Sequence, residues 1–450
     1  MKKNVQITDG PIGRNLLWFT IPIVLTGLLQ LFYNMADVIV VGRFAGKESL
    51  AAVGSTGSLT NLFVNLFIGL SAGASVCVAQ YIGSGNKKAL SRAVHTAIGI
   101  AMAGGVLIAV AGVLLSKQML ILMDAPADVL DEAALYMKII FLGMPANLTY
   151  NFGAGILRAA GDSKRPLMFL AVSGVVNIVL NLVLVICFHM GAEGVGIATV
   201  VSQVLSAVLV LYFLAKKHPD CKLYFRRIRI HMKYLVKILQ IGIPAGIQGV
   251  VFSISNVIIQ SSVNSFGSIV IAGDSAAANI GNLSFIAMNA VHQSMITFVG
   301  QNVGAGKMER IKKIILTGCF QVTVIGIVSS AILYLFGRPL LSLYVPGEEE
   351  VIGYGMLRLK YVMPLYFACG VMDVLVGAQR GMGTSLVPMF ASILGVCGIR
   401  IGWIFTVFVA MRILETLYLS YPVSWAVTAA IQAVLCCVVY KNLKKKQQTA

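Results

Sequence analysis

The chain has 450 residues, of which 58% are hydrophobic and only 12% charged, and its mean hydropathy is +0.86. Soluble domains carry about 25% charged residues, so this composition excludes an ordinary soluble protein and indicates one that crosses a membrane many times. The formal net charge of +18 does not indicate nucleic acid as a partner, because the basic residues alternate from loop to loop instead of gathering in one region.

The first apolar run, residues 15–41, is too long for a cleavable signal peptide and lacks a small-residue cleavage pattern, so we interpret it as a membrane-spanning helix. Polar residues recur along it at i, i+4, i+7, i+8 and i+11 and therefore share one helical face: Thr26, Gln30, Tyr33, Asn34 and Asp37. An ionisable group at membrane depth is costly, which makes Asp37 a candidate functional residue. The alternative is an acid at the outer boundary, close to Arg43.

Eleven further apolar runs follow, and each is long enough for a bilayer that needs about 20 residues. They lie at 52–82, 94–116, 132–157, 166–188, 192–215, 234–264, 278–302, 312–338, 352–379, 386–410 and 416–440. A β-barrel would need short alternating segments. The sequence therefore predicts an all-α membrane protein with twelve transmembrane helices.

The loops between these runs alternate strongly in basic content. The two termini and the loops near 83–92, 158–165, 216–237, 304–313 and 380 hold 26 Lys and Arg, whereas the intervening loops hold five. This distribution predicts that both termini are cytoplasmic and that the basic loops meet anionic lipid. It also predicts that position 274 faces the outside and position 310 the inside.

The two halves of the chain repeat one another. Three sets of residues recur with an offset of about 222: Ile21-Pro22 with Gly27 and Asn34 as Ile243-Pro244 with Gly249 and Asn256, Gln80-x-x-Gly83-x-Gly85 as Gln301-x-x-Gly304-x-Gly306, and Arg158-x-x-Gly161 as Arg380-x-x-Gly383. Six helices per half give both halves the same orientation, related by a pseudo-twofold axis along the membrane normal. We expect an N-terminal lobe (1–215), a flexible cytoplasmic linker (216–233) and a C-terminal lobe (234–450), with a cleft that opens to either side in turn.

These features together resemble the multidrug and toxic compound extrusion (MATE) transporters, in particular their DinF-like branch. The resemblance covers nearly the whole chain and rests on the repeat, on Tyr33-Asn34-x-x-Asp37 and on the Gly-rich loops. It implies antiport of organic cations against protons or sodium ions. It also implies roles for residues of this chain: Asp37 as the coupling carboxylate, Tyr33 as its neighbour, Asn177 and Thr199 as its polar partners, and Pro22 as the bend of the first helix.

The sequence departs from the family pattern at position 181. A second carboxylate is common there, four residues after the asparagine, but this chain has Asn181. A sodium site built from two acids is therefore in doubt. The seventh span offers only neutral groups, Ser253, Asn256 and Gln260, where the NorM-like branch has an acid, and this favours the DinF-like branch.

The proposed site can couple ion and drug through competition. Burial favours the protonated form of Asp37, while Tyr33, Asn34, Asn177, Asn181 and Thr199 offer hydrogen bonds to either form. A cationic drug would favour the ionised form, so proton and drug would exclude each other. Pro22 and Gly27 are read either as a hinge or as a static kink. The coupling ion is expected to be a proton, with sodium as the alternative, and no other cofactor or metal site is expected.

Further polar residues within the spans are candidates for the substrate cleft: Gln30, Ser253, Asn256, Gln260, His292 and Asp373. For Asp373 a structural or solvated role is the alternative, and Asp373 is one candidate partner for Arg400. For His292 the alternative is a hydrogen-bonded packing residue.

The leading hypothesis is a cell-membrane antiporter that exports amphipathic organic cations and works as a monomer among membrane lipids. A flippase of lipid-linked envelope precursors is the closest rival, although it would need a cleft lined with cations. An intramembrane enzyme or a sensor is a third class, but no nucleotide, zinc or nucleophile motif is present.

Overall fold

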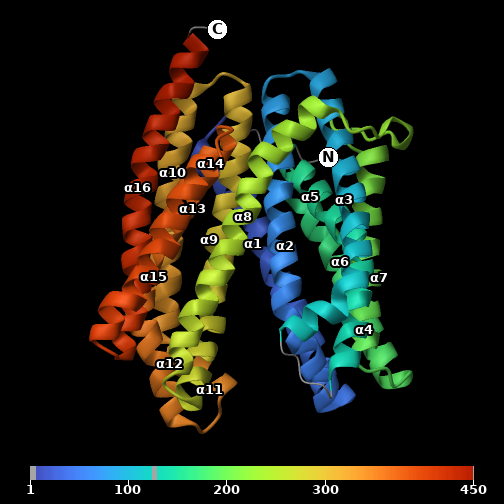
Figure 1. Cartoon of the computed structure of the whole chain (residues 1–450). Coiled ribbons are helices and arrows are strands. Elements are labelled where there is room, and N and C mark those ends of the chain that lie inside the picture. The colour runs from blue at the N-terminus through green and yellow to red at the C-terminus, as the bar shows by residue number, and fades with distance from the viewer. Residues whose placement is uncertain (1–6, 124–128, 449–450) are drawn as a thin grey trace. The chain divides into compact units, whose positions relative to one another are not determined.

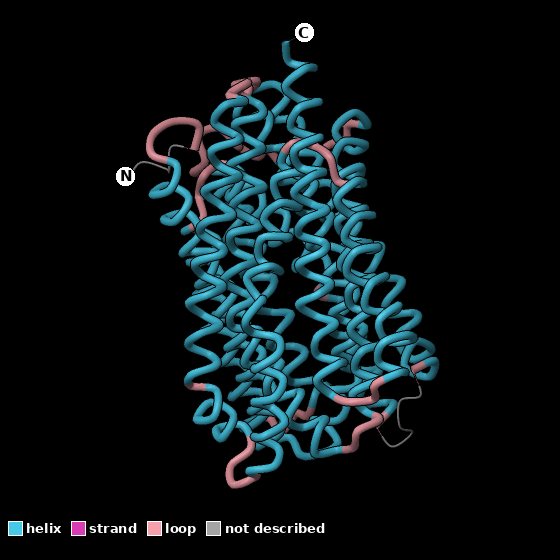
Figure 2. The backbone as a smooth tube through the Cα atoms, turned by 90° about the vertical axis from the view of Figure 1, so that its left-hand side faces the viewer, coloured by secondary structure: helices cyan, strands magenta, loops and turns pink. Residues whose placement is uncertain are grey.

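The computed structural model describes residues 7–123 and 129–448, apart from the side chains of 47, 58, 59, 61 and 62. Over these residues the chain forms helices joined by short loops and no strands (Figure 2). Within the described ranges, eleven helical stretches are long and apolar enough to cross a membrane. The one predicted span that is missing from these stretches is the fourth in chain order, 132–157. It is broken at Gly143 into α4 (Leu130–Leu142) and α5 (Met144–Ala159). The all-α membrane fold is thus confirmed.

The chain divides into two compact units. Unit 1 comprises residues 25–242 and unit 2 comprises residues 7–24 and 243–448 of the described chain. Besides parts of α1 (Ile12–Val40) and α8 (Met232–Asn264), unit 1 contains α2 (Gly46–Gly83), α3 (Lys87–Leu122), α4, α5, α6 (Lys164–Leu182) and α7 (Ala192–Lys216). Unit 2 contains α9 (Ser268–Gly304), α10 (Met308–Leu335), α11 (Gly337–Tyr344), α12 (Glu349–Val362), α13 (Tyr366–Gly381), α14 (Leu386–Ser392), α15 (Ile399–Trp403) and α16 (Leu414–Gln448) (Figure 1).

Two helices change unit along their length. The early part of α1 belongs to unit 2 and its later part to unit 1, and the change falls at Val24, beside Pro22. The early part of α8 belongs to unit 1, and the change falls at Gly242, beside Pro244. The repeated prolines thus mark the two points where a helix passes from one unit to the other. The lobes expected from the sequence, 1–215 and 234–450, have different boundaries: the start of the chain, 7–24, belongs to unit 2, and residues 216–242 belong to unit 1.

The early part of α8 packs tightly against α2 within unit 1. A Cβ atom at Gly73 would lie 2.3 Å from the carbonyl oxygen of Ile238, and one at Gly242 would lie 2.8 Å from the Cα atom of Leu70. Small residues are what allow membrane helices to approach this closely. Because α2 covers it, the early part of α8 is held in unit 1.

The early part of α1 is held in unit 2 by polar and aromatic contacts. The Thr20 and Ser294 hydroxyls are 2.8 Å apart, and the Phe19 and Phe298 rings meet edge to face at 5.5 Å. Gln321 donates to the carbonyl of Gly13 at 2.8 Å. Hydrogen bonds between helices replace water at membrane depth, so these contacts fix this part of α1 to α9 and α10.

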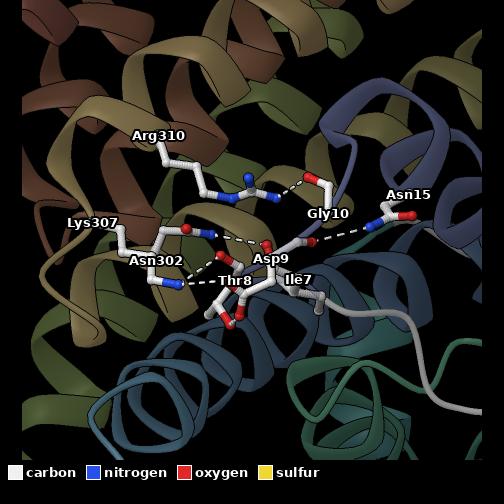
Figure 3. Close-up of polar contacts among 8 residues, drawn as sticks. All are labelled: Ile7, Thr8, Asp9, Gly10, Asn15, Asn302, Lys307 and Arg310. Atoms are coloured by element: carbon white, nitrogen blue, oxygen red, sulfur yellow. Dashed lines mark hydrogen bonds and ion pairs between the residues drawn. The ribbon is translucent and has the colours of Figure 1, made fainter.

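Residues 7–10, which we call the N-terminal clasp, lie on the loop between α9 and α10 (Figure 3). Asn302, Lys307 and Arg310 donate to its backbone carbonyl oxygens at 3.3, 3.0 and 2.8 Å. Lys307 also pairs with the Asp9 carboxylate at 2.7 Å, and this contact lowers the pKa of Asp9 below its ordinary value. The clasp therefore connects the start of the chain to a basic loop of unit 2.

The connector 216–233 is not a free link, contrary to expectation. Cys221 and Leu223 are buried, and a short 3-10 turn forms at Phe225–Arg227. The backbone N–H of Tyr224 donates to Nε2 of His95 in α3 at 3.0 Å. Because α3 and the connector bind each other in this way, the connector belongs to unit 1.

The Gly-rich loops of the two repeats adopt the same backbone conformation. Gly85 and Gly306 have φ of 68° and 69°, and Gly161 and Gly383 have φ of 86° and 91°. Residues with a side chain rarely adopt this left-handed region. The repeated glycines are thus explained by the turn that ends a helix at corresponding places in each half.

Candidate ion-coupling site

Asp37 lies on the part of α1 that belongs to unit 1 and is half-buried. Its Oδ1 accepts a hydrogen bond from the side-chain amide of Asn181, a fully buried residue on α6. Among the described residues, no Lys, Arg or His makes an ion pair with Asp37. The carboxylate is therefore held by a neutral donor and not by an ion pair within the described residues.

Two oxygens near Asp37 lack hydrogen-bond donors. Asn181 also donates to Oδ1 of Asn177 at 3.4 Å, but its own Oδ1 is buried and accepts no bond from the described residues. Thr199 on α7 lies beside the Asp37 carboxyl group, yet its buried Oγ1 makes no hydrogen bond of good geometry within the described chain. The structure thus brings together four of the predicted residues: Asp37, Asn177, Asn181 and Thr199.

Tyr33 has a different role from the one expected. Its hydroxyl donates to the backbone carbonyl of Leu170 on α6 at 3.3 Å rather than to Asp37. Its ring fills the space beside Gly174, where a Cβ atom would lie 1.7 Å from the ring carbon Cζ. Tyr33 therefore anchors α1 to α6 and positions the helix that carries Asp37.

The remaining polar residues of the α1 stripe point elsewhere. Asn34 and Gln30 are exposed, and within the described chain neither makes a hydrogen bond to Asp37. Tyr136 on α4, which the sequence did not indicate, lies close enough to interact with the Asp37 charge. Tyr136 belongs to the span that breaks at Gly143, and no pattern in the sequence shows which face of that short helix turns toward α1.

His292 and Asp373, both proposed for the substrate cleft, contact each other in unit 2. Nδ1 of His292 donates to the backbone carbonyl of Asp373 at 2.6 Å, so its Nε2 can accept from Arg380 at 3.4 Å. Arg380 also donates to Gln248 at 2.9 Å. His292 is thus a hydrogen-bonded connector between α9 and α13, and the charge of Arg380 also acts on Asp373.

Asp373 is not the partner of Arg400, which corrects one expectation. Arg400, 4% exposed on α15, donates from Nε to Ser424 at 3.0 Å and from Nη1 to Asn256 at 3.3 Å. The π-helical segment Ile393–Gly398, which precedes α15, adds residues to the turn and so turns Arg400 toward α8 and α16.

Asp274 is fully buried and pairs with Arg358 of α12, so position 274 belongs to a packed helix rather than to the loop expected between the spans 234–264 and 278–302. The helix α9 begins at Ser268, ten residues before the predicted span.

The other two residues proposed for the seventh span, Ser253 and Gln260, make hydrogen bonds within their own helix. Ser253 donates back to the carbonyl of Gly249 in its own helix at 3.1 Å. Gln260 donates to Asn264 at 3.2 Å near the helix end.

Comparison with known proteins agrees with this architecture. The MatE family profile matches residues 22–183 and 244–406, one stretch in each half. The chain belongs to the MatE family.

The relatives of this MatE protein include transporters and probable drug-resistance proteins. It is 30% identical to the probable multidrug resistance protein YoeA of Bacillus subtilis, over 93% of this chain and 92% of the relative. It is 24% identical to an FAD transporter of Shewanella oneidensis, with 88% of each chain covered.

A solved structure of a MATE family multidrug resistance transporter in an outward-facing conformation has the same fold. Its TM-score is 0.91 at 22% identity, and 99% of each chain is covered. The MatE protein is thus a multi-pass membrane transporter of a drug-exporting family with small-molecule substrates, and its family consists of transporters rather than enzymes.

Proposed function

We propose that this MatE protein exports amphipathic organic cations in exchange for protons, with Asp37 as the coupling group. The observation that carries the proposal is a transmembrane carboxylate whose bonded partner is the neutral amide of Asn181. Ionisable groups at membrane depth mark ion pathways. A relative named as a probable multidrug resistance protein supports drugs as the cargo.

The hydrogen bonds around Asp37 suit both of its protonation states. The ionised form accepts from the amide of Asn181. The protonated form needs an acceptor for its O–H group, and the unpaired oxygens of Asn181 and Thr199 are available. A bound organic cation would favour the ionised form and a proton would displace it, so the two ligands compete for one group.

Sodium is the alternative coupling ion, and the unpaired oxygens of Asn181 and Thr199 favour it as well. A carboxylate, two amide oxygens and a hydroxyl form a set of hard oxygen ligands, which suits alkali and alkaline-earth cations. One carboxylate balances one monovalent charge. The set therefore fits sodium as well as a proton, and only ion-gradient experiments distinguish the two.

We propose further that α1 bends at Pro22, assisted by Gly27, during alternating access. Pro22 lies where α1 passes from unit 2 to unit 1, and a proline removes one backbone hydrogen bond from the helix. A bend there would change the position of Asp37 without unfolding α1. The proposal places both termini in the cytoplasm, treats the protein as a DinF-like MATE transporter and expects the monomer to be active.

The proposal is tested in proteoliposomes that contain the full-length protein. Uptake of a permanently charged aromatic ammonium dye is measured with a pH gradient alone and with a sodium gradient alone. The proposal expects the pH gradient to drive transport and Asp37→Asn to abolish it. Transport driven only by sodium would transfer the coupling role to that ion, and undiminished transport by Asp37→Asn would refute the role of Asp37.

A further inference from the structure

Arg400 is a buried positive charge to which no carboxylate of the described chain serves as counter-ion. Among the described residues no carboxylate lies within ion-pairing distance of its guanidinium. Arg358, in contrast, pairs with Asp274. Its two bonded partners, Ser424 and Asn256, are neutral. An arginine cannot lose its proton at accessible pH, so the charge is permanent.

Aromatic rings complete the surroundings of Arg400. The guanidinium carbon lies 4.4 Å from the centre of the Tyr421 ring and 5.4 Å from that of Trp425. The two rings lie 5.6 Å apart, and Tyr366 meets Trp425 edge to face at 5.1 Å. Cation–π contacts stabilise a guanidinium in part. Because they use its face, the N–H groups, which lie in the plane of the guanidinium, can still donate to an acceptor.

The donors that remain point to a singly charged oxyanion. Nη2 of Arg400 makes no hydrogen bond within the described chain, and the side-chain amide of Asn256, whose oxygen already accepts from Arg400, keeps two N–H groups. Asn256 is exposed and Tyr421 partly exposed, so a ligand can reach this edge. A single guanidinium balances one carboxylate, and its planar fork matches carboxylate geometry.

We propose that Arg400 and Asn256, with Tyr421 and Trp425 beside them, form an anion subsite in unit 2 that binds the carboxylate of an aromatic small molecule. The aromatic part of the ligand would pack on the exposed edge of Tyr421. The subsite would add acidic aromatic compounds to the substrates of the proposed exporter. It rests on the proposed function in one respect, namely that the ligand is a small molecule.

The test measures binding without any ion gradient, in nanodiscs of uncharged phosphatidylcholine that hold the full-length protein. The probes are radiolabelled 9-anthracenecarboxylate, its methyl ester and 9-anthracenemethylammonium, measured by equilibrium dialysis against empty nanodiscs. A hydrogen-bonded charge pair in a desolvated site corresponds to about tenfold or more in affinity. We expect wild-type protein to bind the carboxylate at least about tenfold more tightly than the ester.

Two variants test Arg400 and one serves as a control. Arg400→Gln should remove the preference for the carboxylate. Asn256→Asp should remove it too, because the new carboxylate becomes an internal counter-ion while Arg400 stays in place. Arg412→Gln, which removes an exposed charge, should keep the preference.

The proposal is overturned if wild-type protein binds the carboxylate and the ester equally, or if Asn256→Asp keeps the preference. The second variant decides the matter even where Arg400→Gln does not fold. Because the binding assay uses no ion gradient, a failure of proton coupling would leave its result unchanged, so the two failures give different results.

Discussion

The two units carry polar groups at corresponding positions of the repeat, but their charges are opposite. The offset of 222 residues pairs Asn34 with Asn256, Thr199 with Tyr421 and Ser202 with Ser424. In both units the serine donates to the backbone carbonyl three residues earlier, at 2.7 and 2.8 Å. The same scaffold thus surrounds a carboxylate in unit 1 and a guanidinium in unit 2.

The charged residues themselves do not correspond. The offset places Ile259 opposite Asp37 and Ile399 opposite Asn177. Arg400 is one position further on, after a π-helical segment that α6 lacks over Lys164–Leu182. A local change of helix winding therefore suffices to bring a different side chain to the position facing α8. Repeats preserve the scaffold, while its chemistry is set residue by residue.

Removal of the unit 1 charge should have the largest effect. Asp37→Asn deletes the only group of the proposed coupling site that can ionise near neutral pH, so gradient-driven drug transport should fall to the level of protein-free vesicles. The thermal stability should change little, because an amide can keep a hydrogen bond to Asn181. Asp131→Asn, an exposed acid paired with Lys117, is the matched control and should transport normally.

A second acid in unit 1 should alter ion selectivity. Asn181→Asp places a carboxylate next to Asp37, and two adjacent negative charges repel unless a cation binds between them. Transport by this variant should become sensitive to sodium, measured as the change in dye efflux with external sodium at fixed pH. As a control, Asn34→Asp adds an acid at an exposed position of α1 and should not make transport sensitive to sodium. Identical ion dependence of both variants would place Asn181 outside the site.

The anchor between α1 and α6 should matter for stability more than for ion choice. Gly174→Ala places a methyl group where the Tyr33 ring lies, and such overpacking costs about 1–3 kcal/mol. We expect a lower melting temperature of the detergent-solubilised protein. Gly402→Ala in unit 2 meets no atom within 4 Å and should leave the melting temperature unchanged or raise it. Equal effects of the two variants would contradict the packing described for Tyr33.

The N-terminal clasp should give the smallest effect. Lys307→Ala removes two of its contacts and should increase hydrogen exchange of residues 7–10, with Lys312→Ala as a control at an exposed lysine of the same helix start. The Lys307 contact lowers the pKa of Asp9, so its stabilisation is present above the ordinary value of about 3.9 and is lost only as pH falls below that value. Protection should therefore be equal at pH 7 and about pH 5. A loss of protection by pH 5 would exclude the ion pair.

Hydropathy and the repeat predicted most of the fold, because bilayer thickness dictates span length and the glycine turns are fixed by backbone geometry. The sequence also indicated the four residues that the structure brings together in unit 1. Asp37 follows from its polar stripe at membrane depth, Asn181 from its i, i+4 spacing to Asn177, and Asn177 and Thr199 from the family resemblance. The orientation of Tyr33 could not be predicted, because it depends on the empty space at Gly174 on another helix.

Other features escaped prediction because they depend on contacts distant in the sequence. The connector looked flexible from its charge, yet His95 on α3 binds it. Asp274 lies in a loop of the predicted topology, yet Arg358 from α12 pairs with it inside unit 2. For Arg400, the π-helical segment before it changes the face on which it lies, and spacing rules for regular helices do not foresee this.

If Asp37 exchanges protons for drug, drug transport must move protons in the opposite direction, and this movement can be measured. Proteoliposomes with a pH-sensitive dye in the lumen receive an external quaternary aromatic ammonium compound, with no imposed pH gradient. Inward drug flow through the wild-type protein should drive protons out and make the lumen alkaline, whereas Asp37→Asn should produce no pH change above that of empty vesicles. Equal alkalinisation by wild type and Asp37→Asn would contradict the account.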